Sequence, residues 1–454
     1  MRIPVAPPNL NELIRRAVSS PDNATLVPLL FGSEIGPTPG GEYLHWDRFR
    51  YQAPLPALSI ELMWAAVRIA RNQVLSATPL RDLQGAPFRY GLPPIALELL
   101  HRTDRDASGV IGAPEQVTNP QTQATYLLKS IVEEAITSSQ LEGASTTRRV
   151  AKDMLLSGRA PLTRSERMIA NNYGALQYVR QHRAEPLTPT HVFELQALLV
   201  EGTLDTPDGA GRFRRDDEAI VVEDETGKLL HRPPPEGELQ ARLTTLCDFA
   251  NGEGTREFLH PVIRAILVHF GLAYDHPFVD GNGRTARALF YWVMAREGYW
   301  LCEYVSISRI LKKARAQYAR SFLYTETDEN DATYFILYQL RVLTRAIADL
   351  HDYLDRKATE MREVDDLVRH SRRLRADLNS RQLDLLTHAL KNPRAEFSVA
   401  SHRRAHDVAY GTARSDLLEL AERGLLEQRK RGRSFLFLVP GNLRVRLEPR
   451  QLGS

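Results

Sequence analysis

Residues 276–287 read HPFVDGNGRTAR, and the rest of the chain is best interpreted outward from this stretch. His276 carries an imidazole that titrates near neutral pH and can accept a proton from a hydroxyl nucleophile. Asp280 offers a carboxylate oxygen of the kind that Mg²⁺ prefers. The Gly-Asn-Gly run at 281–283 permits a tight turn with inward-facing N–H groups. A helix beginning near Arg284 would add its positive N-terminal end, so the stretch favours an anion.

The two arginines of this stretch reinforce that interpretation. Arg284 and Arg287 are three positions apart, so a helix places them on one face near its N-terminus. A single histidine, a Gly-Asn-Gly turn or an arginine pair is usually structural when it occurs alone. All of them within twelve residues predict a base beside a site for a polyphosphate, with a metal ligand at its edge. The glycine spacing differs from that of a P-loop and of a dinucleotide-binding fingerprint.

At every specified position the stretch matches HPFx(D/E)GNGRxxR and therefore resembles the Fic family. Residues 259–269 resemble the helix that leads into this motif. Residues 211–214 (GRFR) resemble the family's Gly-x-x-Arg segment, and a hairpin expected at 220–235 resembles its flap. The resemblance covers roughly residues 116–350, a span typical of one domain.

The resemblance implies that the protein transfers AMP from ATP to a Ser, Thr or Tyr hydroxyl of a target protein or of itself. It implies His276 as the general base and Asp280 as the Mg²⁺ ligand. The nucleotide-binding residues that it implies are Gly281, Asn282 and Gly283 at the α-phosphate, Arg284 and Arg287 at the β- and γ-phosphates, and Tyr318 near the adenine. The residues that it implies for a flap, which aligns the target by strand-like pairing, are Ile220, Val221, Val222, Leu229 and Leu230. The chain departs from the family in having extra residues between Tyr318 and Asp331.

A second motif lies upstream, at residues 138–143 (SSQLEG). It resembles the family's inhibitory pattern (S/T)xxxE(G/N), with Ser138 and Glu142 at the specified positions. A glutamate at a helix end can pair with an arginine in bidentate geometry. If that arginine is Arg287, the γ-phosphate of ATP loses its partner, which predicts an N-terminal inhibitory helix over 124–143. Some family members also remove AMP and use this glutamate to position water, so both roles stay open.

Composition limits the class of protein further. The chain has 454 residues, with 59 Lys and Arg against 56 Asp and Glu, and 43% of its residues are hydrophobic. These values are ordinary for a globular protein of two to four domains. No apolar run approaches the roughly 18 residues that cross a bilayer, and the N-terminus lacks the apolar stretch of a signal peptide. With only Cys247 and Cys302, we expect a cytoplasmic protein without a disulfide framework and without a membrane partner.

Patterning predicts a mainly α-helical fold in four parts. These are an N-terminal helical region (1–115), a Fic catalytic domain (116–350), a helical linker (351–375) and a winged-helix domain (376–454). Residues 1–42 are rich in Pro and Gly and predict an irregular lead, and residues 103–120 predict a loop. Helical periodicity is expected over 61–73, 124–141, 166–183, 187–203, 236–250, 259–273, 284–297, 308–325 and 331–356.

The C-terminal part is basic. Residues 371–454 hold 17 Lys and Arg against 9 Asp and Glu. Helices over 381–391, 398–407 and 412–423, a basic turn over 429–433 and a strand over 434–439 follow the order of a winged helix. The residues that suit DNA in this order are Thr412 and Arg414 on the recognition helix and Arg429, Lys430, Arg431 and Arg433 in the wing. The acidic residues Asp416, Glu419 and Glu422 on the same helix weaken the DNA interpretation, and we expect His402 and His406 on a solvated face.

Two classes of function therefore stay open. The first is an autoinhibited protein adenylyltransferase that uses ATP and Mg²⁺. The second is a winged-helix DNA-binding regulator whose Fic core acts as a nucleotide sensor or removes AMP. The winged helix could equally bind a protein or form a homodimer, because a fold does not determine a function.

Overall fold

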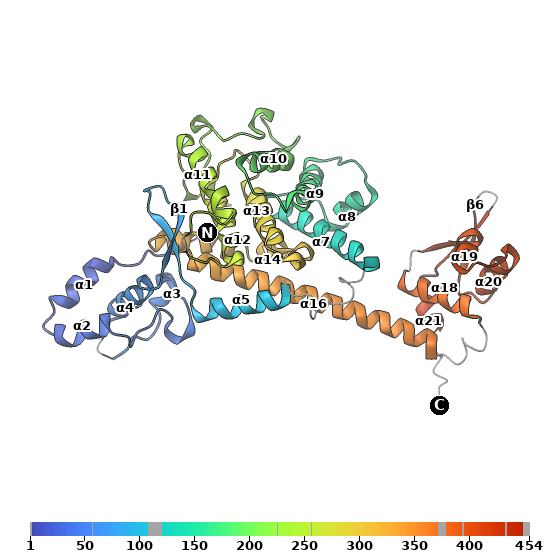
Figure 1. Ribbon diagram of the computed structural model, residues 1–454, viewed down its shortest axis with the longest axis horizontal. Coiled ribbons are helices and arrows are strands. Elements are labelled where there is room, and N and C mark those ends of the chain that lie inside the picture. The colour runs from blue at the N-terminus through green and yellow to red at the C-terminus, as the bar shows by residue number, and fades with distance from the viewer. Residues whose placement is uncertain are drawn as a thin grey trace. The chain divides into compact units, whose positions relative to one another are not determined.

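A computed structural model describes residues 2–56, 58–107, 120–224, 226–255, 257–370, 378–392, 395–431 and 434–447 (Figure 1). The chain divides into two compact units, residues 1–350 and 351–454. The predicted mainly α-helical fold class is confirmed. Within the described residues, every helix is too short or too polar to cross a bilayer.

The first unit is built from helices and two small hairpins. Its helices are α1 (Leu10–Val18), α2 (Asn23–Phe31), α3 (Trp46–Phe49), α4 (Ile60–Asn72), α5 (Pro94–Ala107), α7 (Pro120–Leu141), α8 (Arg148–Ser157), α9 (Arg164–His182), α10 (Pro189–Val200), α11 (Glu236–Ala250), α12 (Pro261–Asp275), α13 (Asn282–Arg296), α14 (Ile307–Lys313) and α15 (Arg315–Thr327). Its strands are β1 (Ser76–Arg81), β2 (Pro87–Tyr90), β3 (Val222–Glu223) and β4 (Leu229–His231), and β1–β2 and β3–β4 form the two antiparallel hairpins. Helix α16 (Thr333–His370) begins in this unit and ends in the second.

Helices α12 and α13 form the centre of the first unit. They pack against each other, α9 and α10 pack against α13, and α11 packs against α12 (Figure 1). Nearly every residue of α12 is buried, and its apolar side chains occur on all sides of the helix. A helix that is apolar all round belongs in a core. The motif at 276–287 therefore joins the two best-shielded helices of the unit.

The N-terminal region corrects two expectations. The irregular lead predicted for 1–42 is wrong, because α1 and α2 lie within it. Asn9 caps α1 by accepting a hydrogen bond from the N–H of Glu12 at 3.1 Å. Leu13 and Leu30 of these helices pack with α4, and this burial outweighs the local Pro and Gly content. The loop predicted over 103–120 is wrong for 103–107, which end α5, and its remainder at 108–119 lies outside the described residues.

A buried ionic cluster joins this region to the residues just before α16. The guanidinium of Arg68 on α4 lies 3.3 Å from the Asp328 carboxylate and 3.6 Å from that of Asp331. All three side chains are almost fully buried. The Tyr43 hydroxyl donates a hydrogen bond to Asp331 at 2.5 Å. Residues 2–107 therefore pack as part of the first unit.

Two further expectations differ from the structure. The helix predicted over 308–325 is two helices, because Ala314 takes a non-helical conformation (φ −130°, ψ 40°) between α14 and α15. The predicted flap hairpin is present, but its first strand begins at Val222, so Ile220 and Val221 precede it. Helix α11 spans the predicted range 236–250.

The second unit combines helices with a small sheet. Its elements are α18 (Ser380–Lys391), β5 (Glu396–Ser398), α19 (Val399–His406), α20 (Tyr410–Glu422), β6 (Glu427–Arg431), β7 (Ser434–Leu438) and α21 (Leu443–Leu447). The antiparallel sheet has the order β5-β7-β6. Arg429 and Lys430 lie on strand β6, so the predicted basic turn is wrong for them. Arg433 lies outside the described residues, as does the side chain of Arg431.

Candidate functional site

The loop between α12 and α13 holds the candidate site. His276 ends α12 in the left-handed region (φ 43°), and its N–H donates to the Leu272 carbonyl at 3.0 Å. A non-glycine residue in this region is strained, and such strain concentrates at functional sites. Gly281 also has a positive φ (88°) and is the N-cap of α13. The chain thus turns from one buried helix into the next over a few residues.

Asn282 closes this loop. Its Oδ1 accepts a hydrogen bond from the Phe278 N–H at 2.9 Å, and its Nδ2 donates to the Phe278 carbonyl at 2.8 Å. Asn282 and Phe278 are both buried. The Asn282 side chain is therefore engaged within the loop.

The imidazole of His276 sits at the mouth of a cavity and is partly buried. The pKa of His276 is lowered to about 4, chiefly by burial; the nearby His231 also lowers it, while the Ala273 carbonyl and the Glu142 carboxylate oppose this shift. Its Nδ1 lies 3.4 Å from the Ala273 carbonyl oxygen. An Nδ1–H that donates to this carbonyl leaves Nε2 as the acceptor. The ring is therefore neutral at pH 7 and has a free lone pair.

Arg214, in the GRFR segment, fixes the backbone of His276. Its Nε donates to the His276 carbonyl at 2.8 Å, and its Nη2 donates to the Pro234 carbonyl at 2.5 Å. Its own N–H donates to the Pro277 carbonyl at 2.9 Å. One buried side chain thereby ties the histidine loop to the segment that follows the flap.

An anion site lies at the N-terminal end of α13, over Gly283. A Cβ built on Gly283 would overlap Oε1 of Glu142, so this carboxylate rests directly against the glycine backbone. Free N–H groups in the first turn of a helix, together with the helix dipole, favour a negative group at that position. The carboxylate of Glu142 occupies this position.

Arg284 is buried beneath this site. Its Nη1 donates to the Leu199 carbonyl at 2.8 Å, and its Nη2 lies 3.2 Å from both carboxylate oxygens of Asp280. Its Nε has no hydrogen-bond partner among the described residues. Asp280 is 42% exposed and also accepts from the Gly281 N–H at 2.5 Å. Arg284 therefore braces the loop as well as adding positive charge to it.

Arg287 is bound by Ser138 and Glu142, at the C-terminal end of α7. Its Nη2 lies 2.8 Å from Glu142 Oε1, and its Nε donates to the Ser138 hydroxyl at 2.9 Å. Its Nη2 also donates to the Ser138 carbonyl at 3.2 Å. Burial raises the pKa of Glu142, but the ion pair and hydrogen bond with Arg287 outweigh it, so the net pKa is lowered. Glu142 is therefore a carboxylate at neutral pH.

A cavity of about 220 Å³ brings together seven of the fifteen predicted site residues. The predicted residues that line it are Glu142, Val222, Leu230, His276, Gly283, Arg287 and Tyr318. Of the other predicted residues, Asp280 and Gly281 lie in the adjoining loop and Asn282 and Arg284 in the first turn of α13, and Ser138 contacts this site through Arg287. Leu229 is 42% exposed, on the outer side of the flap.

Tyr318, on α15, lines the same cavity, and sequence reasoning missed His231, which also lines it. The Tyr318 hydroxyl is 2.8 Å from Nε2 of His269. His231, at the end of β4, lies 2.8 Å from Glu326 through Nδ1 and 2.8 Å from the Tyr274 carbonyl through Nε2. These contacts anchor the flap to α12 and α15. The histidine that begins the HRPPP run at 231–235, at the end of the flap, was the signal that could have indicated it.

Comparison with known proteins agrees with this geometry. Residues 186–294 match the model of the Fic/DOC family, so the chain contains a Fic domain. A protein from Nematostella vectensis named protein adenylyltransferase Fic is 28% identical over 236 residues, 50% of this chain and 52% of that protein. A Drosophila willistoni protein of the same name is 34% identical over 127 residues, which are 28% of this chain and 23% of that protein. The chain thus spans about half the length of the first relative and less of the second.

A solved structure supports the fold. The crystal structure of a Fic family protein from Desulfovibrio desulfuricans G20 aligns with a TM-score of 0.50 at 19% sequence identity. The alignment covers 77% of this chain and 96% of that one. At this identity the likeness establishes a shared fold and leaves the chemistry to the site.

Proposed function

We propose that the protein is a protein adenylyltransferase, which transfers AMP from ATP to a hydroxyl side chain of a target protein or of itself. The observation that carries the proposal is the pairing of a neutral His276 with an anion site over Gly283, in one cavity. The names of the Nematostella and Drosophila relatives support the same activity.

The residues suggest a balanced transfer step. The target hydroxyl oxygen bonds to the α-phosphorus of ATP, the bond from that phosphorus to the bridging oxygen of the β-phosphate breaks, and pyrophosphate leaves. The hydroxyl proton passes to Nε2 of His276, which acts as the general base. The N–H groups at the start of α13 stabilise the charge that develops on the phosphate oxygens.

Mg²⁺ fits the edge of this site. The Asp280 carboxylate is 42% exposed and adjoins the anion site. One carboxylate combined with phosphate oxygens and water is a common ligand set for Mg²⁺. Asp280 would hold the ion, which neutralises phosphate charge when bound.

We also propose that Glu142 inhibits the transfer. Its carboxylate lies against Gly283 and pairs with Arg287 at 2.8 Å, so it competes with a phosphate group for both. Ser138 supports the same conformation through Arg287 Nε. An ATP molecule would bind productively only after this carboxylate has left.

Incorporation of α-³²P from ATP into protein tests both proposals. The proteins compared are the wild type, Glu142→Gly, Glu142→Gly with His276→Ala, and Glu133→Gln as a control. Glu133 lies on the same helix α7 but pairs with the exposed Arg148, 2.6 Å away. We expect strong labelling by Glu142→Gly, none by the double variant, and wild-type labelling by the control.

Two outcomes would contradict these proposals. If the double variant were labelled as strongly as Glu142→Gly, His276 would not be the general base. Equal labelling of the wild type and Glu142→Gly would remove Glu142 from the inhibitory role. Absence of label in every protein would favour the nucleotide-sensor alternative, with ATP binding measured in parallel.

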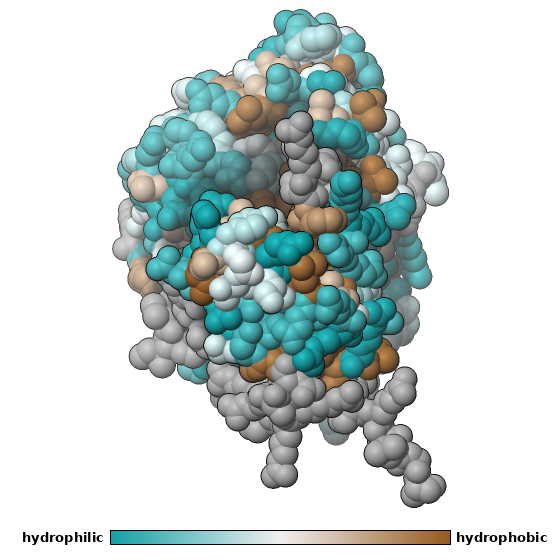
Figure 2. All heavy atoms as spheres, turned by 90° about the vertical axis from the view of Figure 1, so that its right-hand side faces the viewer, coloured by the Kyte–Doolittle hydropathy of each residue, from teal (hydrophilic) through white to brown (hydrophobic). Residues whose placement is uncertain are grey.

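A second candidate function, DNA binding, belongs to the winged-helix interpretation of residues 376–454. Asp416, which was expected to weaken the DNA interpretation, is only 4% exposed and pairs with Arg381 at 2.8 Å. His402, expected on a solvated face, is buried and lies 3.1 Å from Asp416. The outer surface of α20 instead presents Thr412 and Arg414. On the side of the molecule shown in Figure 2, hydrophilic side chains predominate among the described residues.

Fluorescence anisotropy with labelled duplex DNA tests this second candidate on the full chain. Arg414→Glu should weaken binding and reduce the salt slope by about 1, as loss of one phosphate contact does. Arg15→Glu, the same charge change on the exposed surface of α1, is the control. Equal weakening by both variants, or binding that is insensitive to salt, would refute the DNA interpretation.

A further inference from the structure

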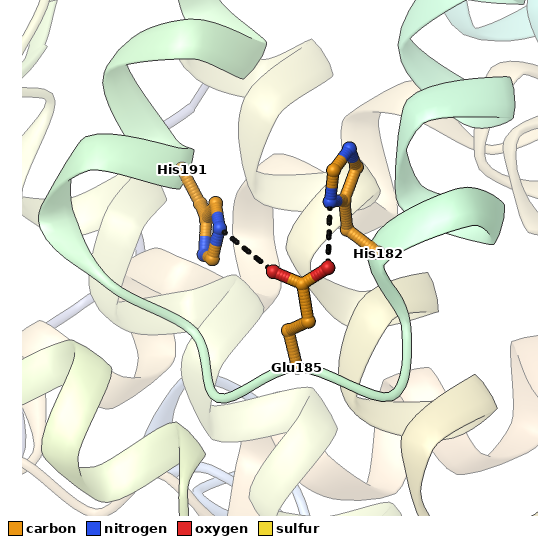
Figure 3. A group of neighbouring side chains, drawn as sticks. All are labelled: His182, Glu185 and His191. Atoms are coloured by element: carbon orange, nitrogen blue, oxygen red, sulfur yellow. Dashed lines mark hydrogen bonds and ion pairs between the residues drawn. The ribbon is translucent and has the colours of Figure 1, made fainter.

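A group of three potential metal ligands lies apart from the cavity, at the corner between α9 and α10 (Figure 3). His182 Nδ1 is 3.0 Å from Oε1 of Glu185, and His191 Nε2 is 3.5 Å from Oε2 of the same carboxylate. One atom from each of the three residues lies within 4.8 Å of the other two. Figure 3 shows the two rings on opposite sides of the carboxylate, both directed toward it.

The surrounding structure holds the three residues in place. His182 ends α9, Glu185 lies in the connecting loop, and His191 is in the first turn of α10, whose N-cap is Thr188. The Glu185 carbonyl accepts a hydrogen bond from the indole N–H of Trp292 on α13 at 3.3 Å.

Asn251 adds a second anchor to the connecting loop. Its side chain bonds both the N–H and the carbonyl of Leu187, each at 2.8 Å. A ligand group built on elements fixed in this way needs little reordering to bind an ion.

The spacing suits a transition metal. Zn²⁺ binds imidazole nitrogen and carboxylate oxygen at about 2.0–2.2 Å, so neighbouring ligand atoms in a tetrahedron lie roughly 3.3 Å apart. The two nitrogen–oxygen distances, 3.0 Å to one carboxylate oxygen of Glu185 and 3.5 Å to the other, are each close to this value. Two imidazoles with one carboxylate favour Zn²⁺ over Mg²⁺, which prefers oxygen ligands.

We propose that His182, Glu185 and His191 bind one Zn²⁺ ion. The side chain of Glu185 is 52% exposed, which gives the ion a path from solvent and leaves the fourth position for water. The bound ion links the end of α9 to the start of α10. Helix α10 also carries Gln196, whose Nε2 donates to the Asp280 carbonyl at 3.1 Å. The Zn²⁺ ion therefore stabilises a helix that supports the His276 loop.

Equilibrium dialysis of the full chain against Zn²⁺, after treatment with EDTA, tests the proposal by elemental analysis. The variants are His191→Ala and Glu185→Gln. The control is His101→Ala, which removes an exposed histidine of α5. We expect the wild type and the control to bind one more Zn²⁺ per chain than the two variants at micromolar free Zn²⁺. A parallel dialysis against Mg²⁺ should show no difference among the four proteins.

Thermal unfolding and Co²⁺ substitution provide two further readouts. Zn²⁺ should raise the unfolding temperature of the wild type, because an ion that binds only the folded state stabilises it. It should leave the unfolding temperature of Glu185→Gln unchanged. Because Glu185 is exposed, this substitution should not prevent the chain from folding. Co²⁺ should give the visible bands of tetrahedral coordination in the wild type alone. Equal Zn²⁺ binding by all four proteins, or an equal temperature shift in wild type and Glu185→Gln, would overturn the proposal.

Discussion

Glu142 and Arg287 are 145 positions apart in the sequence, and their side chains meet at 2.8 Å. The guanidinium of Arg287 is 2% exposed, and Glu142 is 32% exposed. The pair therefore joins a deeply held arginine to a carboxylate at the rim of the cavity. Because Glu142 directly follows α7, a local change at the end of that helix can separate Glu142 from Arg287.

Substitution of Glu142 by Gln should strengthen ATP binding. Glutamine keeps the size and helical preference of the side chain but loses the charge that Arg287 and the start of α13 attract. A hydrogen bond to a charged group contributes about 1.5–3 kcal/mol, so the dissociation constant should fall roughly 10- to 100-fold. Isothermal titration with ATP and Mg²⁺ measures this, and Glu133→Gln should bind like the wild type.

The rate of AMP transfer by Glu142→Gly should be almost independent of pH between about pH 5 and 8. Burial lowers the pKa of His276 to about 4, and a base works in its unprotonated form. Activity dependent on this group is thus present above the lowered pKa and is lost as the pH falls through it. Removal of Glu142 takes away a charge that raises this pKa, so the direction is unchanged. Single-turnover rates would contradict the prediction if they halved near pH 6.5.

Asn282→Ala should destabilise the first unit. It leaves the N–H and carbonyl of buried Phe278 without their partners, at about 1–3 kcal/mol for each group. Urea unfolding followed by tryptophan fluorescence measures the loss. Asn23→Ala serves as the control, because Asn23 is exposed and its side chain bonds only the Val18 carbonyl. Equal effects of the two substitutions would mean that the loop does not depend on this amide.

Arg68→Leu should cost about 3–5 kcal/mol of folding free energy, because it leaves buried Asp328 and Asp331 without their cation. Burial already raises the pKa of Asp328 to about 6, and Arg68 opposes that rise. Arg16→Leu removes an exposed partner of Glu12 and should cost under about 1 kcal/mol. Thermal unfolding of both variants at pH 7 provides the comparison, and a similar loss in both would refute the prediction.

Sequence reasoning was most successful where local pattern and burial agree. Helices α11 and α13 have a periodicity that tertiary packing reinforces, so their positions were predictable. Helices α1 and α2 were missed because Pro and Gly nearby suggested an irregular chain. Their stability comes from packing on α4, which a single sequence does not display.

The sequence predicted which types of residue form the site, but it did not predict the contacts between them. The signature identified His276, Asp280 and Arg287 as a group, because the motif itself brings them near one another. Arg284 donates hydrogen bonds to the Leu199 carbonyl and to the Asp280 carboxylate. Only the fold shows these contacts and the burial of the guanidinium. The cluster at His182, Glu185 and His191 had a sequence signal in the spacing of three and six residues. That signal is weak, since any helix end can contain it.

If a phosphate binds over Gly283 as proposed, the close approach of Glu142 to Gly283 makes the carboxylate and that phosphate mutually exclusive occupants of one position. A nucleotide that needs this position is bound only by the fraction of molecules in which the end of α7 has moved away. Its apparent dissociation constant then equals the intrinsic one divided by that fraction. If the end of α7 is displaced in about 1% of molecules, affinity falls about a hundredfold without the loss of a single contact to ATP. Nucleotide affinity in this protein is thus a measure of how often one helical turn frays.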